Sequence, residues 1–251
     1  MGAFSRYRLL SLKNKPRFTE GEIRLNGLSF YYADPLALFN GYRDIFIRQI
    51  YHFSPERPQP VILDLGGYIG MAAMYFKTCF PEARIVTFEP DPYIFGILKR
   101  NIEVNGFSDI KLINAGAGKR EESALYYPDN AGGGSFYIKT ENSEIDVKFI
   151  KLSGCISDKI DLLKLNIEGM EYEVLLEIEH KMGFINEIIL EYHNFKDLPQ
   201  SLGHILNCLD KNGFRYVVSE VPSVKTIFPS RLESRSKNFN LVYAKKKKQI
   251  R

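Results

Sequence analysis

The segment VILDLGGYIG, residues 61–70, constrains the fold of this chain more than any other feature. Its first three residues form a buried-strand run, Asp64 follows them, and three glycines then let the backbone turn sharply without a Cβ clash. Residues 71–76 read as the helix that follows. Twenty-five residues after Asp64, the next strand ends in Glu89, which is placed to accept hydrogen bonds from ribose hydroxyls. These features predict the first half of a nucleotide-binding βαβ unit.

The glycine spacing indicates which nucleotide this unit binds. A dinucleotide loop, G-x-G-x-x-G, counted from Gly66 would need glycines at positions 68 and 71, where Tyr68 and Met71 stand. The observed pattern is D-x-G-G-x-x-G. An acid beside the loop suits the cationic amino group of S-adenosylmethionine (AdoMet), whereas it would repel a pyrophosphate. We therefore expect AdoMet as the cofactor. An ordinary strand–turn–helix corner is the alternative, and the position of Glu89 argues against it.

Length and composition place the chain among globular proteins. Its 251 residues allow one large domain, or one domain with a small extension, and 45% of them are hydrophobic. No run approaches the ~20 apolar residues of a membrane span, and the start, MGAFSRYRLL, does not fit a signal peptide. The three cysteines lie far apart without metal-ligand spacing. We therefore expect reduced thiols in a cytoplasmic protein.

The basic character of the chain is local. The net charge is +4, but the end of the chain, KKKKQIR, carries five positive charges and leaves 29 basic against 30 acidic residues elsewhere. This balance gives no broad electrostatic footprint for nucleic acid. The run from Lys245 to Lys248 could make a weak contact with an anionic membrane surface, although a solvated tail is the preferred reading.

The N-terminal part predicts a small cap. Residues 1–20 are basic and interrupted by proline, so we expect an irregular arm. Residues 22–34 read as a hairpin whose turn is Asn26-Gly27, and residues 36–51 carry apolar residues at helical spacing. We divide the chain into a cap at 1–59, a cofactor-binding domain at 60–245 and a basic tail at 246–251.

From residue 61 onward, predicted strands alternate with predicted helices, which favours a mostly parallel sheet with right-handed crossovers. Between 123 and 151 short alternating pieces predict an antiparallel insertion or hairpins at the edge of the sheet. That insertion contains a Gly-rich stretch, residues 129–135, which reads as a flexible turn or as a mobile flap over the substrate. The expected strands are 61–65, 84–89, 110–114, 161–167, 187–192, 214–219 and 239–244, and the expected helices are 69–79, 92–105, 170–181 and 198–211.

Three segments together resemble the FkbM family of AdoMet-dependent methyltransferases. They are VILDLGGYIG, IVTFEPDPYIFGILKRNIEVNG, and IDLLKLNIEGMEYEVLLE followed by EIILEYH. The second contains the asparagine pair Asn101 and Asn105, and the third contains Lys164 within LKLNIEG. The resemblance covers roughly residues 60–195 and implies a Rossmann-like class I methyltransferase. Such a fold has a seven-stranded, mostly parallel sheet with helices on both faces, to which this chain adds its N-terminal cap.

Two departures from the family pattern concern the chemistry. Tyr68 stands where the family has an asparagine in the loop, and Asn166 stands where it has an acid. Ser153 and Gly154 replace an acidic pair. Fewer carboxylates remain to bind a hard cation, so we expect no metal ion.

The carboxyl ends of parallel strands predict where ligands bind. We expect the first loop and Glu89 to bind the cofactor, together with two residues after the third strand. Asn166 ends the fourth strand beside the methyl group. His193 is the candidate general base, with Glu168 and Glu191 as its partners or as acceptor ligands. The predicted cofactor residues are Asp64, Gly66, Gly67, Tyr68, Gly70, Glu89, Asn114, Ala115 and Asn166.

The predicted activity is O-methylation. The resemblance implies a hydroxyl acceptor on a sugar or a secondary metabolite, hence a small-molecule or saccharide partner. Tyr68 and Asn166 also leave a second hypothesis, in which the protein binds AdoMet with little or no turnover and acts as a binding module. An NAD-dependent oxidoreductase is a third, which the glycine spacing disfavours.

Overall fold

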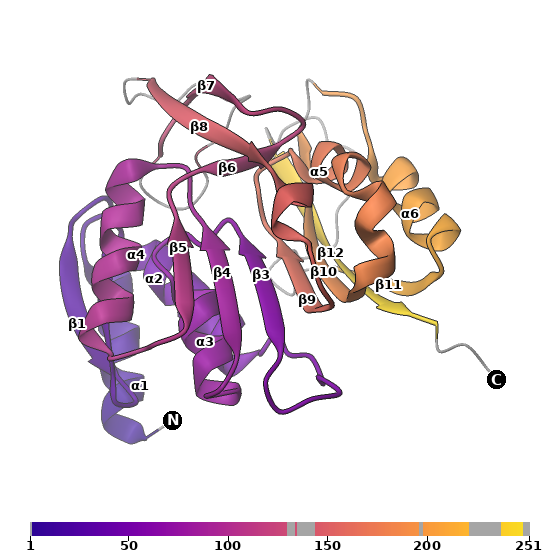
Figure 1. Cartoon of the computed structure of the whole chain (residues 1–251). Coiled ribbons are helices and arrows are strands. Elements are labelled where there is room, and N and C mark those ends of the chain that lie inside the picture. Colours follow the sequence, from indigo (N-terminus) through magenta and orange to yellow (C-terminus); the bar gives the residue numbers. More distant parts are fainter. Residues whose placement is uncertain (1, 130–133, 135–143, 196–197, 221–236, 248–251) are drawn as a thin grey trace.

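A seven-stranded sheet forms the centre of the molecule, with strand order β11-β12-β10-β9-β3-β4-β5 (Figure 1). The computed structural model describes residues 2–129, 134, 144–195, 198–220 and 237–247. β12 runs antiparallel to both of its neighbours, and the pairs among β10, β9, β3, β4 and β5 are parallel. All seven predicted strands are confirmed, as β3 (Val61–Leu65), β4 (Arg84–Phe88), β5 (Ile110–Ile113), β9 (Ile160–Leu165), β10 (Ile185–Phe195), β11 (Phe214–Glu220) and β12 (Lys237–Lys246).

Helices cover both faces of this sheet, as predicted. Successive residues of a strand point to opposite faces, so Ile62 and Leu63 of β3 belong to different hydrophobic clusters. Ile62 packs in one cluster with α3 and α4, and Leu63 packs in the other with α5 and α6. The four predicted helices are confirmed, as α3 (Met71–Cys79), α4 (Pro92–Val104), α5 (Glu171–Glu177) with the 3₁₀ turn η4 (Glu179–Phe184), and α6 (Leu202–Lys211).

The N-terminal segment is more regular than its sequence predicts. The expected irregular arm is wrong, because α1 (Ala3–Ser11) and the 3₁₀ turn η1 (Leu12–Asn14) occupy it. Leu9 and Leu12 are buried in the same cluster as α3, so docking against the core stabilises this short helix. The predicted hairpin is confirmed as β1 (Gly21–Leu25) and β2 (Leu28–Tyr32). The predicted helix appears as α2 (Pro35–Tyr42) followed by the π-helical turn η2 (Arg43–Ile47).

Asn101 of α4 and Asn105, the C-cap of this helix, attach the hairpin to the sheet domain. Asn101 accepts from the amide of Tyr31 at 2.6 Å and donates to its carbonyl at 2.9 Å. Asn105, one helical turn later, makes the same pair of bonds to Ser29, each at 2.8 Å. Each side-chain amide thus satisfies the free edge of β2 as a neighbouring strand would. This contact gives the N-x-x-x-N pattern a structural role.

A second, three-stranded sheet, with order β6-β8-β7, lies across the carboxyl ends of β3 and β4 (Figure 1). It consists of β6 (Gly116–Gly118), β7 (Glu122–Tyr126) and β8 (Ile145–Lys151), and the 3₁₀ turn η3 (Leu152–Cys155) follows. β7 and β8 are antiparallel, which confirms the predicted insertion. The predicted piece at 135–139 and most of the Gly-rich stretch 129–135 lie outside the described residues.

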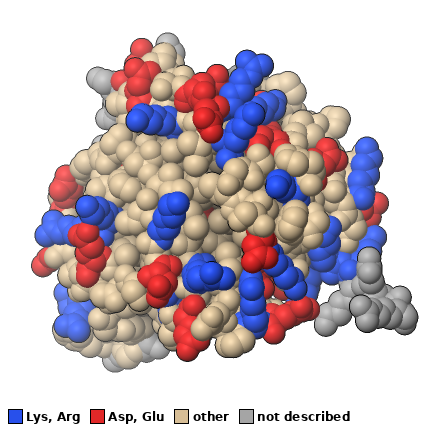
Figure 2. All heavy atoms as spheres, in the orientation of Figure 1, with Lys and Arg blue, Asp and Glu red and all other residues tan. Residues whose placement is uncertain are grey.

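The surface and the cysteines have no unusual features in the part of the chain that is described. Basic and acidic side chains alternate on the face shown in Figure 2. All three cysteines are free thiols. Among the described residues, none of the helices has the length and apolarity that a bilayer span requires.

Candidate active site

The glycine loop after β3 fits tightly between β4 and β9. The amides of Gly66 and Gly67 both donate to the carbonyl of Phe88, at 3.1 and 2.8 Å. Gly66 has φ +79°, and a Cβ atom on it would lie 1.7 Å from the carbonyl oxygen of Asn166. Gly70 has φ +88° and begins α3. The loop therefore requires glycine for close approach as well as for its backbone conformation.

Gly66→Ala should displace the loop and lower cofactor affinity by at least about tenfold, which corresponds to ~1.4 kcal/mol. The left-handed conformation alone costs an alanine about 1–2 kcal/mol, and the clash with Asn166 adds to that. Calorimetric titration with AdoMet checks this. Gly96→Ala is the matched control, because Gly96 is exposed within α4 with open space around its Cβ position, and alanine there should be neutral or stabilising. Equal binding by the parent and Gly66→Ala would contradict this reading of the loop.

A buried ion pair supports the loop from below. Lys164 Nζ lies 3.0 Å from Asp64 Oδ1 and donates to the carbonyls of Gly66 and Leu65, at 2.7 and 3.2 Å. Thr87 donates to the second oxygen of Asp64 at 2.9 Å. Asp64 is fully buried, so the structure places this predicted cofactor residue beneath the loop, in contact with other protein groups.

Glu89 lies at the carboxyl end of β4 with both oxygens hydrogen-bonded. Oε2 accepts from the amide of Tyr68 at 2.8 Å, and Oε1 accepts from the amide of Asp91 at 3.0 Å. Burial raises the pKa of this carboxyl to about 8, while the two amide bonds oppose that rise. A buried carboxyl with a strongly raised pKa is a costly feature that functional sites often contain.

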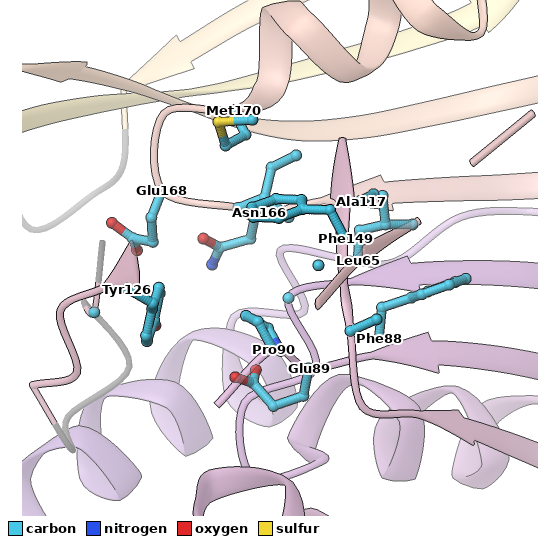
Figure 3. Close-up of a pocket in the computed structure, with 15 residues that line it drawn as sticks. Leu65, Phe88, Glu89, Pro90, Ala117, Tyr126, Phe149, Asn166, Glu168 and Met170 are labelled. Atoms are coloured by element: carbon cyan, nitrogen blue, oxygen red, sulfur yellow. The ribbon is translucent and has the colours of Figure 1, made fainter. Parts of the chain in front are cut away.

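Glu89 lines a partly enclosed pocket with an empty volume of about 560 Å³, open solvent included, which we call the Glu89 pocket (Figure 3). Phe88 and Pro90 lie in the lower part of Figure 3, and Ala115 also lines the pocket. Tyr126, Phe149 and Met170 contribute further to the lining. Two of those three, Tyr126 and Phe149, belong to the three-stranded sheet, so the insertion forms part of the wall. Mostly apolar walls with the Glu89 carboxyl among them suit a flat base attached to a diol.

A second pocket adjoins the first, and residues of the N-terminal segment form part of its lining. We call it the His193 pocket; its empty volume is about 990 Å³, open solvent included. The two pockets share three residues, Gly66, Asn166 and Glu168, which therefore stand at their junction. The lining also includes polar residues from separate elements, namely Asn40, Asp44, Tyr51, Tyr68, Lys164, Glu191 and His193.

His193 lies between two carboxylates. Its Nδ1 lies 2.8 Å from Oε1 of Glu171, and its Nε2 lies 3.4 Å from Oε1 of Glu168. The imidazole is only 5% exposed. Glu168 has φ 55° and Gly169 has φ 103°, so two successive left-handed residues bring β9 into α5 at this point. Backbone in this region is costly for a non-glycine residue and recurs at functional sites.

Glu191 is another carboxylate in the lining of the His193 pocket, and it is hydrogen-bonded to Tyr51. Its Oε1 accepts a short hydrogen bond from the hydroxyl of Tyr51, and Nδ2 of Asn166 lies 3.5 Å from the same hydroxyl. Burial raises the pKa of Tyr51, and the nearby Glu191 carboxylate raises it further. The Asn166 amide, the Tyr51 hydroxyl and the Glu191 carboxylate thus form a chain of hydrogen bonds. An ionised acid at position 166, as is typical of the family, has no hydrogen to donate to Tyr51.

Most of the predicted site residues come together around these two pockets. Gly66, Asn166 and Glu168 line both, whereas Gly67, Tyr68, Glu191 and His193 line only the second. Ala115 lines the Glu89 pocket, but the side chain of Asn114 donates to the carbonyls of Glu89 and Pro90 and is not part of the lining. Gly70 starts α3 beneath the loop.

Sequence reasoning missed Tyr51 and the contact of Glu171 with His193. Tyr51 is the last residue of the predicted helical segment 36–51, and Glu171 lies at the start of the predicted helix 170–181. Their partners lie 140 and 22 residues away along the chain. The available signal for Glu171 is its position within LKLNIEGMEYE, part of one of the segments that resemble the family.

The model of the FkbM methyltransferase domain matches residues 64–216, more than half of the chain. This protein belongs to the FkbM methyltransferase family. The match begins at Asp64 and includes every predicted site residue. The family membership confirms the predicted fold class, and it establishes methyltransferase as the functional class.

Characterised relatives of this FkbM-domain protein share about a quarter of its sequence. Methyltransferase 1 of Beauveria bassiana is 28% identical over 191 residues, which cover 64% of this chain and 76% of the relative. The 31-O-demethyl-FK506 methyltransferase FkbM of Streptomyces tacrolimicus is 26% identical, with 72% and 83% covered. The solved structure of TYW2 of Pyrococcus horikoshii in complex with MeSAdo has a TM-score of 0.50 and 12% identity, covering 93% of this chain and 74% of that one. The structural similarity supports the fold alone.

Proposed function

We propose that this FkbM-domain protein transfers a methyl group from AdoMet to a hydroxyl oxygen of a small-molecule or saccharide acceptor. The observation that carries the proposal is the junction of the two pockets at Gly66, Asn166 and Glu168. One pocket has the apolar walls and carboxyl suited to an adenosine. The other has the His193 and Glu191 groups that an acceptor alcohol needs. Two ligands placed in them would meet at the junction.

The Glu89 pocket fits the nucleoside part of AdoMet. Glu89 would accept hydrogen bonds from the ribose hydroxyls, and Phe88, Pro90, Ala115 and Phe149 would enclose the base. The loop at Gly66 would bring backbone close to the methionine part. When bound, AdoMet supplies a methyl carbon that an oxygen nucleophile displaces from sulfur, leaving S-adenosylhomocysteine.

The His193 pocket fits an acceptor that must lose a proton. His193 would take that proton through Nε2, the ring nitrogen farther from its carboxylate partner. Glu191 or Glu168 would accept a hydrogen bond from the acceptor. The segment Asn166-Ile-Glu-Gly lacks the Asn/Asp-Pro-Pro-aromatic motif of many amino-methylating enzymes, which favours an oxygen acceptor. The name of the Streptomyces relative, a 31-O-demethyl-FK506 methyltransferase, supports the same reading.

Calorimetry with the two nucleotide classes tests the cofactor assignment. AdoMet and S-adenosylhomocysteine should bind, and NAD should not, because the loop lacks the glycines that a pyrophosphate needs. Binding of NAD in the absence of AdoMet binding would overturn the assignment.

Methyl transfer should proceed without a divalent cation. The described residues contain no group of three or more His, Cys, Asp or Glu side chains that could hold a metal ion, and Asn166 supplies an amide in place of a hard anionic ligand. Turnover with labelled AdoMet should be unchanged by EDTA. Loss of turnover in EDTA with recovery on added magnesium would contradict this expectation.

A further inference from the structure

Glu171 is buried beneath the candidate base, although nothing in the proposed reaction assigns it a role. Glu171 is 0% exposed and lies on the first turn of α5, whereas His193 lies on β10. Oε1 of Glu171 lies 2.8 Å from Nδ1 of His193, a shorter contact than the 3.4 Å between Nε2 and Oε1 of Glu168. α5 and β10 meet at this contact.

The hydrogen bonds of Glu171 define which atoms donate to it. Oε1 accepts from the amides of Ile167 and Gly169, at 3.3 and 3.1 Å, and Oε2 accepts from Gly169 at 3.1 Å. Both oxygens therefore act as acceptors toward backbone N–H groups. Because Oε1 is an acceptor toward both amides, the ring nitrogen that lies 2.8 Å from it is a donor, so Nδ1 of His193 carries the hydrogen. In a neutral imidazole this leaves the lone pair on Nε2. Oε1 of Glu168 faces the other ring nitrogen, Nε2, at the longer distance of 3.4 Å.

We propose that Glu171 is a positioning residue, which holds His193 in the Nδ1–H form with Nε2 presented as the base for acceptor deprotonation. This inference rests on the proposed function. When the acceptor O–H bond breaks, its proton moves to Nε2, its electron pair stays on the oxygen that takes the methyl group, and the positive charge on the ring is stabilised by Glu171. The arrangement uses the same principle as the carboxylate of a catalytic triad, which orients a histidine and stabilises its charged form.

Histidine NMR on the intact protein tests the tautomer without any acceptor or cofactor. The chain has four histidines, so ¹⁵N-histidine labelling gives few signals, and those lost in His193→Ala identify His193. The proposal predicts hydrogen on Nδ1 and none on Nε2 at neutral pH. The Nε2–H form, or a ring protonated on both nitrogens, would overturn it. This result is independent of whether methyl transfer is found.

Turnover of a double variant separates positioning from a purely structural role. Glu171→Gln keeps the shape but cannot balance the charge of the protonated ring. It should lower kcat by at least about tenfold, and by no more than His193→Ala does, without changing AdoMet affinity. Added to His193→Ala it should cost little more, because residues that act as a unit are not additive. Glu173→Gln is the matched control, since Glu173 is on the same first turn and pairs with Lys119. Additive losses, or an equal effect of Glu173→Gln, would overturn the proposal.

Discussion

His193→Ala should lower kcat by roughly 10²–10⁴-fold, the usual contribution of a general base. The variant removes the imidazole that lies between Glu168 and Glu171 at one wall of the His193 pocket. AdoMet affinity should barely change, because His193 does not line the Glu89 pocket. Single-turnover measurements with labelled AdoMet, together with calorimetry, give the two quantities separately.

His180→Ala is the control for this variant, because His180 is exposed and lies outside both pockets. The pH–rate profile adds a second criterion. Only neutral imidazole can accept a proton, so the parent rate should fall as the pH becomes acidic, and this limb should disappear in His193→Ala. Equal rates of the parent and the variant along the acidic limb would remove His193 from the mechanism. Glu168 or Glu191 would then be the next candidate.

Glu89→Ala should weaken AdoMet binding by on the order of 1.5–3 kcal/mol, the scale of a lost hydrogen bond to a charged group. The fold should survive, since Glu89 stands at the end of β4 and lines a pocket. Glu103→Ala, a change at an exposed position of α4, is the control. If the folded variant binds AdoMet as tightly as the parent does, Glu89 is not the ribose ligand.

The raised pKa of Glu89 makes this binding depend on pH. In the protein without cofactor, burial raises the pKa of Glu89 to about 8. The carboxyl must therefore lose its proton before both of its oxygens can accept hydrogen bonds from the ribose hydroxyls. AdoMet affinity should therefore rise with pH, by up to about tenfold per unit below 8, and then level off. Calorimetry in buffers of different ionisation enthalpy should detect proton release on binding in the parent and none in Glu89→Gln.

The same carboxyl has the opposite effect on the stability of the protein without cofactor. In the unfolded chain its pKa is near 4.5, so the folded state binds more protons between pH 4.5 and about 8. Stability from this group is then lost as the pH rises through that window. Glu89→Gln should raise the free energy of unfolding by on the order of 1–3 kcal/mol near pH 7, with little effect at pH 4. Denaturant unfolding at the two pH values checks this difference.

The sheet could be predicted from the sequence because its strands are buried on both faces. Runs such as Val61–Leu65 and Ile160–Leu165 read as near-continuous apolar segments. The turns at the glycine loop and at Asn26-Gly27 could also be predicted, because their residues adopt positive φ angles that these residue types favour. α1 was missed because a nine-residue basic segment has little helical preference of its own, and burial of Leu9 and Leu12 decides its structure.

The candidate site could be predicted residue by residue but not as a set of contacts. Carboxyl ends of parallel strands gather Gly66, Glu89, Asn166 and His193 at one edge, which follows from topology. The Lys164–Asp64 ion pair beneath the loop and the Tyr51–Glu191 hydrogen bond depend on side-chain packing between distant segments. The ion pair places Asp64 against protein groups, and the Tyr51–Glu191 hydrogen bond brings the N-terminal segment into the His193 pocket.

Transfer of an isotopically labelled methyl group shows whether this protein methylates an oxygen. A cell extract is incubated with the protein and AdoMet carrying a ¹³C-methyl group, and the products are compared by mass spectrometry with those of His193→Ala and of heat-inactivated protein. We expect a labelled O-methyl product that forms with the parent and is depleted by about 10²-fold or more with His193→Ala. AdoMet binding without any labelled product would contradict it and favour a binding module, and label found on nitrogen would contradict the oxygen acceptor.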